Sequence, residues 1–161
     1  MAESRKGGCL CGSVHFRALG EPLRVHACHC TFCQRRTGSA FAEVAYYLEG
    51  SIVVTGGELT TYTHRSDVSG RWLRMEFCST CGTCVTITLE RRPGERGIHI
   101  GTLDDPKSLP IRRHIWTMSQ QGSTLIPEDA ERRMHGLDES DLSEPAKNYA
   151  AKGGSQVNRA K

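Results

Sequence analysis

The eight cysteines of this 161-residue chain fall into three tight groups whose spacing suits metal binding. Neighbouring cysteines in each group are one or two residues apart, which lets several thiolates converge on a single ion. Such close neighbours are also poorly placed for disulfides that would link distant parts of a fold. The groups are Cys9-x-Cys11, Cys28-x-Cys30-x2-Cys33 and Cys78-x2-Cys81-x2-Cys84.

The two outer groups resemble halves of a closed zinc site. Gly12 and Gly82 directly follow a cysteine. A glycine there permits a positive φ, which turns backbone N–H groups toward the sulfurs. Each outer group also precedes a predicted strand, so a sheet can bring the two together. We therefore predict a four-thiolate structural zinc; pairing of groups that follow one another in the chain is the alternative. Its ligands are Cys9, Cys11, Cys78 and Cys81.

The central group offers three sulfurs, Cys28, Cys30 and Cys33, and leaves one tetrahedral position open. The candidates for that position are His26, His29, Cys84, a water molecule and a substrate thiol. Because His29 lies between two ligands, we expect its side chain to point away from the metal. We expect Cys84 to pack as a small apolar residue in a strand.

Three thiolates donate much electron density to a zinc ion, so such a zinc is a weaker Lewis acid than one held by histidines. This ligand set suits the capture and deprotonation of a fourth thiol. The central group therefore favours thiol chemistry over water-driven hydrolysis. An iron–sulfur cluster is disfavoured, because the third group is followed by Thr88 and Leu89 where the ferredoxin spacing has cysteine and proline.

Short strands must position these groups. Apolar residues alternate with polar ones in several segments between residues 13 and 117, which is the pattern of half-buried strands. Turn sequences separate the segments. The sequence predicts a mainly β fold built of antiparallel meanders, without a long helix in this region. The expected strands are 14–18, 41–47, 51–55, 59–64, 73–77, 85–89, 97–102 and 111–117.

The chain divides into residues 1–127, a zinc-binding β domain, and residues 128–161, a C-terminal extension. Pro127, Glu128 and Asp129 suit the first turn of a helix, which predicts a short helix through Met134. Beyond Leu142 the composition is polar and predicts a disordered tail. The length of the chain is that of one domain.

Charge and composition narrow the function. A net charge of +3 is too small and too dispersed to predict a nucleic-acid partner, although it suits a small anionic substrate. No apolar run has the length of a membrane span, and the N-terminus lacks the apolar stretch of a signal peptide. We therefore expect a cytoplasmic protein without a membrane partner, in which thiols stay reduced. The oligomeric state is not predicted.

Four segments together resemble the glutathione-dependent formaldehyde-activating enzyme (GFA) family, which includes the centromere protein V domain. They are GGCLCGSVHF, CHCTFCQRRTGSAF, FCSTCGTCV and His114-Ile115-Trp116, in the order of the family, over residues 7–117. One departure is Gly122-Ser123, where family members often carry a proline–tryptophan pair.

The resemblance implies a compact, zinc-stabilised β fold, shared with the Rab-accessory type of zinc protein, and two zinc ions per chain. It also implies that the outer cysteines hold a structural zinc and that Cys28, Cys30 and Cys33 hold a catalytic one. The implied reaction joins formaldehyde and glutathione into S-hydroxymethylglutathione, formally a carbon–sulfur lyase reaction in reverse.

A glutathione pocket needs cations for two carboxylates, and Arg35 and Arg36 follow the central group directly. Gly38 is expected to serve the backbone, and His114 and Trp116 either line a pocket or pack in the core. No acidic residue adjoins the central group, so no general base is predicted. The leading function is a zinc enzyme acting on a small thiol adduct; the alternatives are a non-catalytic zinc scaffold that binds a protein partner, and a thiol-based sensor.

Overall fold

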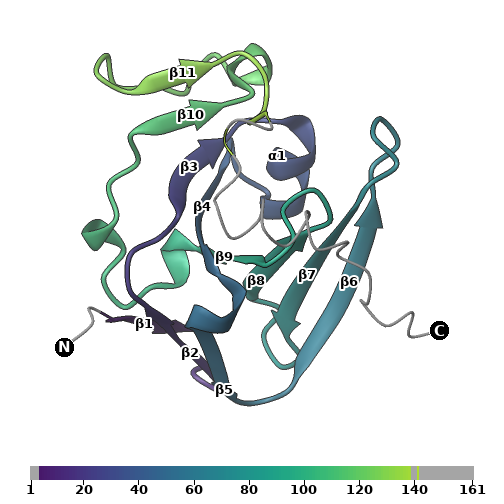
Figure 1. Ribbon diagram of the computed structural model, residues 1–161, viewed down its shortest axis with the longest axis vertical. Coiled ribbons are helices and arrows are strands. Elements are labelled where there is room, and N and C mark those ends of the chain that lie inside the picture. Colours follow the sequence, from purple (N-terminus) through teal and green to yellow (C-terminus); the bar gives the residue numbers. More distant parts are fainter. Residues whose placement is uncertain (1–3, 139–140, 142–161) are drawn as a thin grey trace.

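The structure, a computed structural model, describes residues 4–138 and residue 141. These residues form two β-sheets, a single short α-helix and several 3-10 turns (Figure 1). The disordered tail predicted beyond Leu142 lies outside the described residues. No helix in the described part of the chain has the length and apolarity needed to cross a membrane.

The larger sheet contains eight strands in the order β11-β10-β3-β4-β9-β8-β7-β6, and the smaller contains β1-β2-β5. Most neighbours are antiparallel, but β10 is parallel to both β3 and β11. The strands are β1 Ser4–Gly8, β2 Val14–Leu19, β3 Arg24–Cys28, β4 Ala42–Leu48, β5 Ile52–Gly56, β6 Leu59–Arg65, β7 Trp72–Cys78, β8 Cys84–Leu89, β9 Glu95–His99, β10 Arg113–Ile115 and β11 Glu131–Arg133. The helix is α1 Thr31–Thr37, and the 3-10 turns are η1 Glu49–Ser51, η2 Ile100–Thr102, η3 Pro106–Ser108 and η4 Thr117–Ser119.

The mainly β class is confirmed, and each of the eight expected segments contains or overlaps a strand. Strand β2 shows why alternation works, since its burial alternates strictly from Val14 to Leu19. Strand β3 was not predicted. Four of its five residues are buried, including the polar Arg24 and His26, so its burial does not follow the polar–apolar alternation of its sequence. Helix α1 has only seven residues, too few to display a helical period.

The predicted helix from Pro127 to Met134 is wrong. Pro127 begins a turn, closed by the Ala130 N–H donating to the Pro127 carbonyl at 3.2 Å. Residues Glu131–Arg133 then form β11, which pairs in parallel with β10. The Pro-Glu-Asp sequence favours the start of a helix, but this local preference contributes little free energy. Pairing of residues 131–133 with the free edge of β10 therefore determines the structure here.

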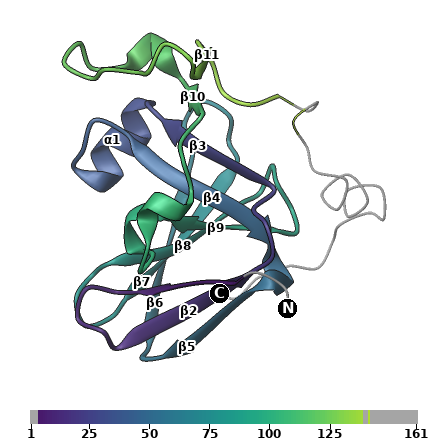
Figure 2. The same cartoon turned by 90° about the vertical axis from the view of Figure 1, so that its left-hand side faces the viewer.

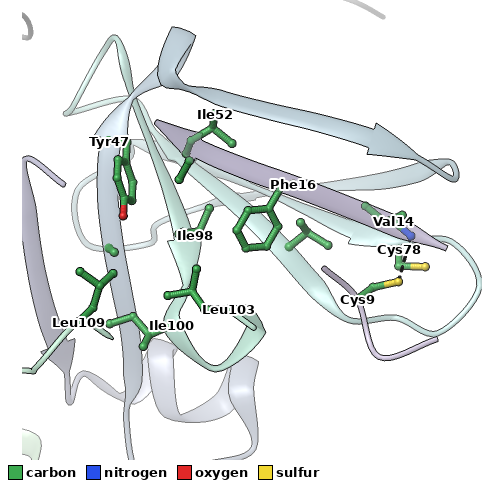
Figure 3. Packing of buried hydrophobic residues seen from close by; sticks show 13 residues of the cluster. Cys9, Val14, Phe16, Tyr47, Ile52, Cys78, Ile98, Ile100, Leu103 and Leu109 are labelled. Atoms are coloured by element: carbon green, nitrogen blue, oxygen red, sulfur yellow. Dashed lines mark hydrogen bonds between the residues drawn. The ribbon is translucent and has the colours of Figure 1, made fainter. Parts of the chain in front are cut away.

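Buried side chains form two clusters, one at each site of cysteine convergence. The first lies between the sheets and includes Phe16 of β2, Tyr47 of β4 and Ile98 of β9, with Cys9 and Cys78 at its margin (Figure 3). The second lies between α1 and the large sheet and includes Cys28 and Cys33 together with Ile87. The two sheets and α1 can be followed from the side in Figure 2. Each group of cysteines therefore borders a packed core.

Candidate metal centres and active site

Two hairpin turns bring the outer cysteines together. Cys9 and Cys11 lie in the turn between β1 and β2, and Cys78 and Cys81 lie at the turn between β7 and β8. The four sulfurs lie within 4.8 Å of one another. Cys11 Sγ is 3.5 Å from Cys9 Sγ and 3.7 Å from Cys78 Sγ. Thiolates bound tetrahedrally to zinc lie about 3.8 Å apart, so the arrangement fits a closed four-sulfur site.

Glycine geometry supports both turns as expected. Gly12 has a φ of 76° and Gly82 a φ of 70°. Their N–H groups donate to the carbonyls of Cys9 and Cys78 at 3.0 and 2.9 Å. No atom lies within 4 Å of a Cβ added at either position, so conformation alone favours glycine there.

Two hydroxyl residues around this cluster were not predicted. Ser13 Oγ lies 3.1 Å from Cys11 Sγ and 3.2 Å from Cys78 Sγ. Thr83 Oγ1 lies 3.2 Å from Cys81 Sγ and accepts from the Leu10 N–H at 3.1 Å, so it also links the two turns. Such outer contacts orient metal ligands. The serine and threonine directly follow the Cys-Gly pairs, which is the only sequence signal that could have identified them.

Hydrogen bonds favour the thiolate form at two of these sulfurs, Cys9 and Cys81, whereas the neighbouring thiols raise the pKa of Cys11. The Val14 N–H donates to Cys9 Sγ at 3.2 Å, and this bond lowers the pKa of the Cys9 thiol to about 5. Contacts with Thr83 lower the pKa of Cys81 to about 7. Since the thiolate is the form that binds metal, the cluster is prepared for a cation.

The central cysteines converge at the junction of β3 and α1. Their three sulfurs lie within 4.8 Å of one another, with 3.5 Å between Cys28 Sγ and Cys30 Sγ. Cys30 is also the N-cap of α1, because its sulfur accepts from the Cys33 N–H at 3.3 Å. Gly38 ends the helix with a φ of 63°, which is the backbone role expected of it.

The three neighbouring thiols shift one another's pKa values in opposite directions. Hydrogen bonds from Cys28 and Cys33 lower the pKa of Cys30, whereas the same hydrogen bonding and burial raise the pKa of Cys28. Three adjacent sulfurs therefore do not all ionise by themselves. A divalent cation supplies the charge that lets every ligand thiol lose its proton. The donor set, burial and spacing fit a metal held by Cys28, Cys30 and Cys33.

No histidine of the described residues joins the three converging sulfurs, although His26 lines the cavity beside them. His29 is fully buried and its Nε2 lies 2.9 Å from His114 Nδ1, so it points away from the sulfurs as expected. This contact places His114 in the core. His26 stacks on Tyr46, and burial, followed by the charge of Arg24, lowers the pKa of His26 to about 3.

Cys84 stands outside both groups of converging ligands. It begins β8, is half-buried, and packs against the second core cluster. Burial raises the pKa of its thiol to about 11, which keeps it protonated and apolar. The structure thus agrees with a packing role for Cys84.

The parallel strand β10 brings the His114-Ile115-Trp116 segment beside the central cysteines. Ile115 is the register partner of Cys28, and its carbonyl accepts from the His29 N–H at 3.0 Å. The next residue, Trp116, has a φ of 58° and is the one described non-glycine residue with positive φ. This uncommon conformation lies at a cavity wall, where strained residues often mark a functional site.

A cavity of about 170 Å³ opens beside the three cysteines. Its wall contains apolar side chains from β4, β7 and β8, as well as Trp116. Four arginines also line it, of which only one was expected. They are Arg24, Arg36, Arg91 and Arg92.

The two arginines predicted to bind substrate, Arg35 and Arg36, lie in different surroundings. Arg36 lines the cavity and donates from Nη1 to His99 Nε2 at 2.9 Å. Arg35 is exposed and lines a separate groove with Gln34 and His64 on the other side of Phe32. Residues one apart on a helix point in different directions, which explains the divergence.

The fold is therefore a mainly β one with two cysteine clusters that could each hold a metal ion, one of them beside an arginine-lined cavity. Comparison with known proteins gives the family: the sequence profile described as glutathione-dependent formaldehyde-activating enzyme matches residues 4–119. The chain belongs to this family.

A solved structure supports the assignment of the fold. A crystal structure of a Rhodobacter sphaeroides protein is similar, with a TM-score of 0.51 and 28% sequence identity. The similarity covers 66% of this chain and 96% of that one. A search of curated proteins found no match.

Proposed function

We propose that the protein is a zinc-dependent enzyme that forms or cleaves an adduct between a small thiol and an aldehyde. The family is named for the glutathione-dependent activation of formaldehyde. The corresponding reaction is the formation of S-hydroxymethylglutathione from formaldehyde and glutathione, formally a carbon–sulfur lyase reaction in reverse. The observation that carries the proposal is a three-cysteine cluster that borders a cavity lined by arginines. In this proposal Cys28, Cys30 and Cys33 hold the catalytic zinc, and the four outer cysteines hold the structural one.

A zinc ion at the central cysteines would lower the pKa of a substrate thiol and hold its sulfur near the aldehyde. The sulfur forms a bond to the carbonyl carbon, and the proton released from the thiol ends on the former carbonyl oxygen. Cleavage reverses both changes. The cavity walls exclude water and limit the orientations of the two reactants, which lowers the entropic cost of their meeting.

Arg36 is the cation nearest to this chemistry. Its side chain lies close enough to Cys33 for the negative charge of that sulfur to raise the pKa of Arg36, against the opposing effect of burial. We propose that Arg36 attracts an anionic thiol, whereas the substrate-binding role predicted for Arg35 is not part of the proposal because Arg35 lines a separate groove. No Asp or Glu occurs among the described cavity-lining residues, so the proposal includes no protein base.

A non-catalytic scaffold would require the fourth position to be filled by the protein. Cys84 lies outside the central group of sulfurs, and His29 bonds His114. Both observations favour the enzyme over the scaffold.

Exchange NMR of formaldehyde with glutathione tests the proposal. The zinc-loaded protein should accelerate exchange between free and adduct carbon, and a folded Cys30→Ser protein should not. Equal exchange rates with both proteins, at full occupancy of the remaining metal site, would refute the enzymatic function.

A further inference from the structure

The cavity beside the central cysteines is small for a peptide ligand. Its volume of about 170 Å³ is below the range of roughly 300–1,000 Å³ typical of sites for drug-sized molecules. Glutathione is a tripeptide with two carboxylates and an ammonium group. The cavity therefore suits a ligand that is shorter than glutathione.

Two arginines that line this cavity have N–H donors available for an anion. Arg24 and Arg92 are each more than nine-tenths buried, with exposures of 8% and 3%. Arg24 forms an ion pair with Glu95, but its Nη2 has no hydrogen-bond partner among the described residues. Arg92 Nη2 donates to the Asp138 carbonyl at 2.7 Å, whereas its Nη1 is likewise unpartnered in the described part of the chain. Glu95 compensates the charge of Arg24, but a buried N–H donor that has no acceptor is still costly, and an anion that accepts from both arginines would remove this cost.

The electrostatics of Arg92 agree with an excess of positive charge. Burial, and then the neighbouring charge of Arg24, lower the pKa of Arg92, and the opposing charges of Glu95 and Asp141 do not cancel this shift. The lining also includes Arg36 and Arg91, and the described lining residues include no acidic side chain. A carboxylate would satisfy the free donors and relieve the repulsion between the cations.

One wall of the cavity comes from beyond the part of the chain that matches the family profile. Gly136 and Leu137 line the cavity, and the match ends at residue 119. Three hydrogen bonds attach this segment: Arg91 Nη2 donates to the Leu137 carbonyl at 2.7 Å, Arg92 donates to Asp138, and the Trp116 N–H donates to the His135 carbonyl at 3.1 Å. A Cβ on Gly136 would lie 2.8 Å from Trp116 Nε1, so the segment packs closely over the tryptophan.

We propose that this cavity selects a small thiol carrying one carboxylate, with its sulfur at Cys28, Cys30 and Cys33 and its carboxylate at Arg24 and Arg92. Gly136 and Leu137 set the upper limit on ligand size. The sulfur end of this proposal rests on the proposed function, whereas the carboxylate end rests on the arginines alone. Glutathione is then a poor fit, since its ammonium group finds no acidic partner in the described lining.

Titration calorimetry of the zinc-loaded protein tests the selection without turnover. The probes are 3-mercaptopropionate, 2-mercaptoethanol, which lacks the carboxylate, and glutathione. We expect 3-mercaptopropionate to bind at least about tenfold more tightly than either of the others, because a charge-assisted hydrogen-bond pair is gained. Equal binding of the two small thiols, or tighter binding of glutathione, would overturn the proposal.

Two neighbouring arginines provide a matched pair of variants. Arg91→Gln and Arg92→Gln each remove a guanidinium that donates to a carbonyl of the 137–138 segment. Only Arg92 combines deep burial with a free Nη1. Arg92→Gln should reduce the preference for 3-mercaptopropionate to less than about twofold, and Arg91→Gln should leave it above about fivefold. If both variants lose the preference for 3-mercaptopropionate equally, the preference depends on the attachment of residues 137–138, and the carboxylate site is contradicted.

Leu137→Ala provides a second test should Arg92→Gln fail to fold. Opening this wall should raise the affinity for glutathione relative to 3-mercaptopropionate by about fivefold or more, since the added space admits the longer ligand. An unchanged ratio would contradict the size limit.

The two proposals can fail separately. Arginine-dependent binding of 3-mercaptopropionate, without acceleration of any aldehyde adduct, would refute the enzymatic function and retain the carboxylate site. Accelerated exchange with glutathione, without tighter binding of 3-mercaptopropionate, would refute the carboxylate site and retain the enzymatic function.

Discussion

The two cysteine clusters use the same ligand atom but differ in how the chain reaches them and in what surrounds them. The outer cluster joins two hairpin turns that are distant in sequence, and its sulfurs are backed by Ser13 and Thr83. The central cluster is assembled within one strand–helix junction and borders a cavity. Ligand type alone therefore does not determine the role of a cysteine site. We propose that the cluster joining distant parts of the chain stabilises the fold and that the cluster beside the cavity is the one available for chemistry.

The largest effect should follow from breaking the outer cluster. We expect Cys81→Ser to abolish soluble, folded protein, because structural zinc in small finger domains supplies about 10–16 kcal/mol of folding free energy. Circular dichroism and metal analysis of the purified protein measure this. A Cys81→Ser protein that unfolds at the wild-type temperature would contradict the structural role of the outer cluster.

The central cluster should respond differently to the same change. We expect Cys30→Ser to lose one metal ion per chain, to keep its fold, and to lose at least about 100-fold in adduct-forming activity, since the substrate sulfur loses its metal. Because Cys30 also caps α1, the substituted serine is a suitable choice: its hydroxyl can replace the cap. Metal content, thermal unfolding and exchange NMR give the three readouts. Unfolding of this variant would remove the distinction between the clusters.

The neighbouring arginines test which side of α1 faces the chemistry. Arg36→Gln should lower kcat/KM for an acidic thiol by about tenfold, because it removes a cation from the cavity. Arg35→Gln is the control on the exposed side and should change kcat/KM by less than about twofold. Steady-state kinetics with each variant decide the matter. A larger effect at Arg35 would place the ligand in the outer groove.

The smallest effect should come from Cys84, the one cysteine outside both clusters. Cys84→Ala removes only a half-buried sulfur and should cost about 1 kcal/mol of stability. Metal analysis should still give two ions per chain. Loss of one ion would show that Cys84 fills the fourth position of the central site, and both sites would then be closed.

Sequence reasoning succeeded where a signal was local. The spacing of the cysteines indicated that they are metal ligands, and the place of His29 between Cys28 and Cys30 indicated that it points away. The pairing of the two outer groups was only preferred, from the expected strands and the family resemblance. Alternation identified most strands. It did not identify β3, in which the polar Arg24 and His26 are buried, or the strand that replaced the predicted helix after Pro127.

The carboxylate end of the cavity had no local signal. Arg24 ends up beside Arg92 because β3 and the turn before β9 meet across β4. Arginine in a strand or turn is usually solvent-exposed, so composition gave no reason to bury either residue. Burial of this kind depends on long-range packing, including the wall formed by Gly136 and Leu137, and becomes visible only in three dimensions.

The separation of the outer cysteines also has a consequence for the order of folding. Cys11 and Cys78 are 67 residues apart in sequence, so joining them closes a long loop. The central three cysteines span one short segment and need no such closure. Local contacts form earlier than distant ones, so we expect the central cysteines to acquire metal first as the chain emerges during synthesis. On this expectation the outer metal binds last, because its four ligands come together only after the chain from β1 to β7 has reached its native arrangement.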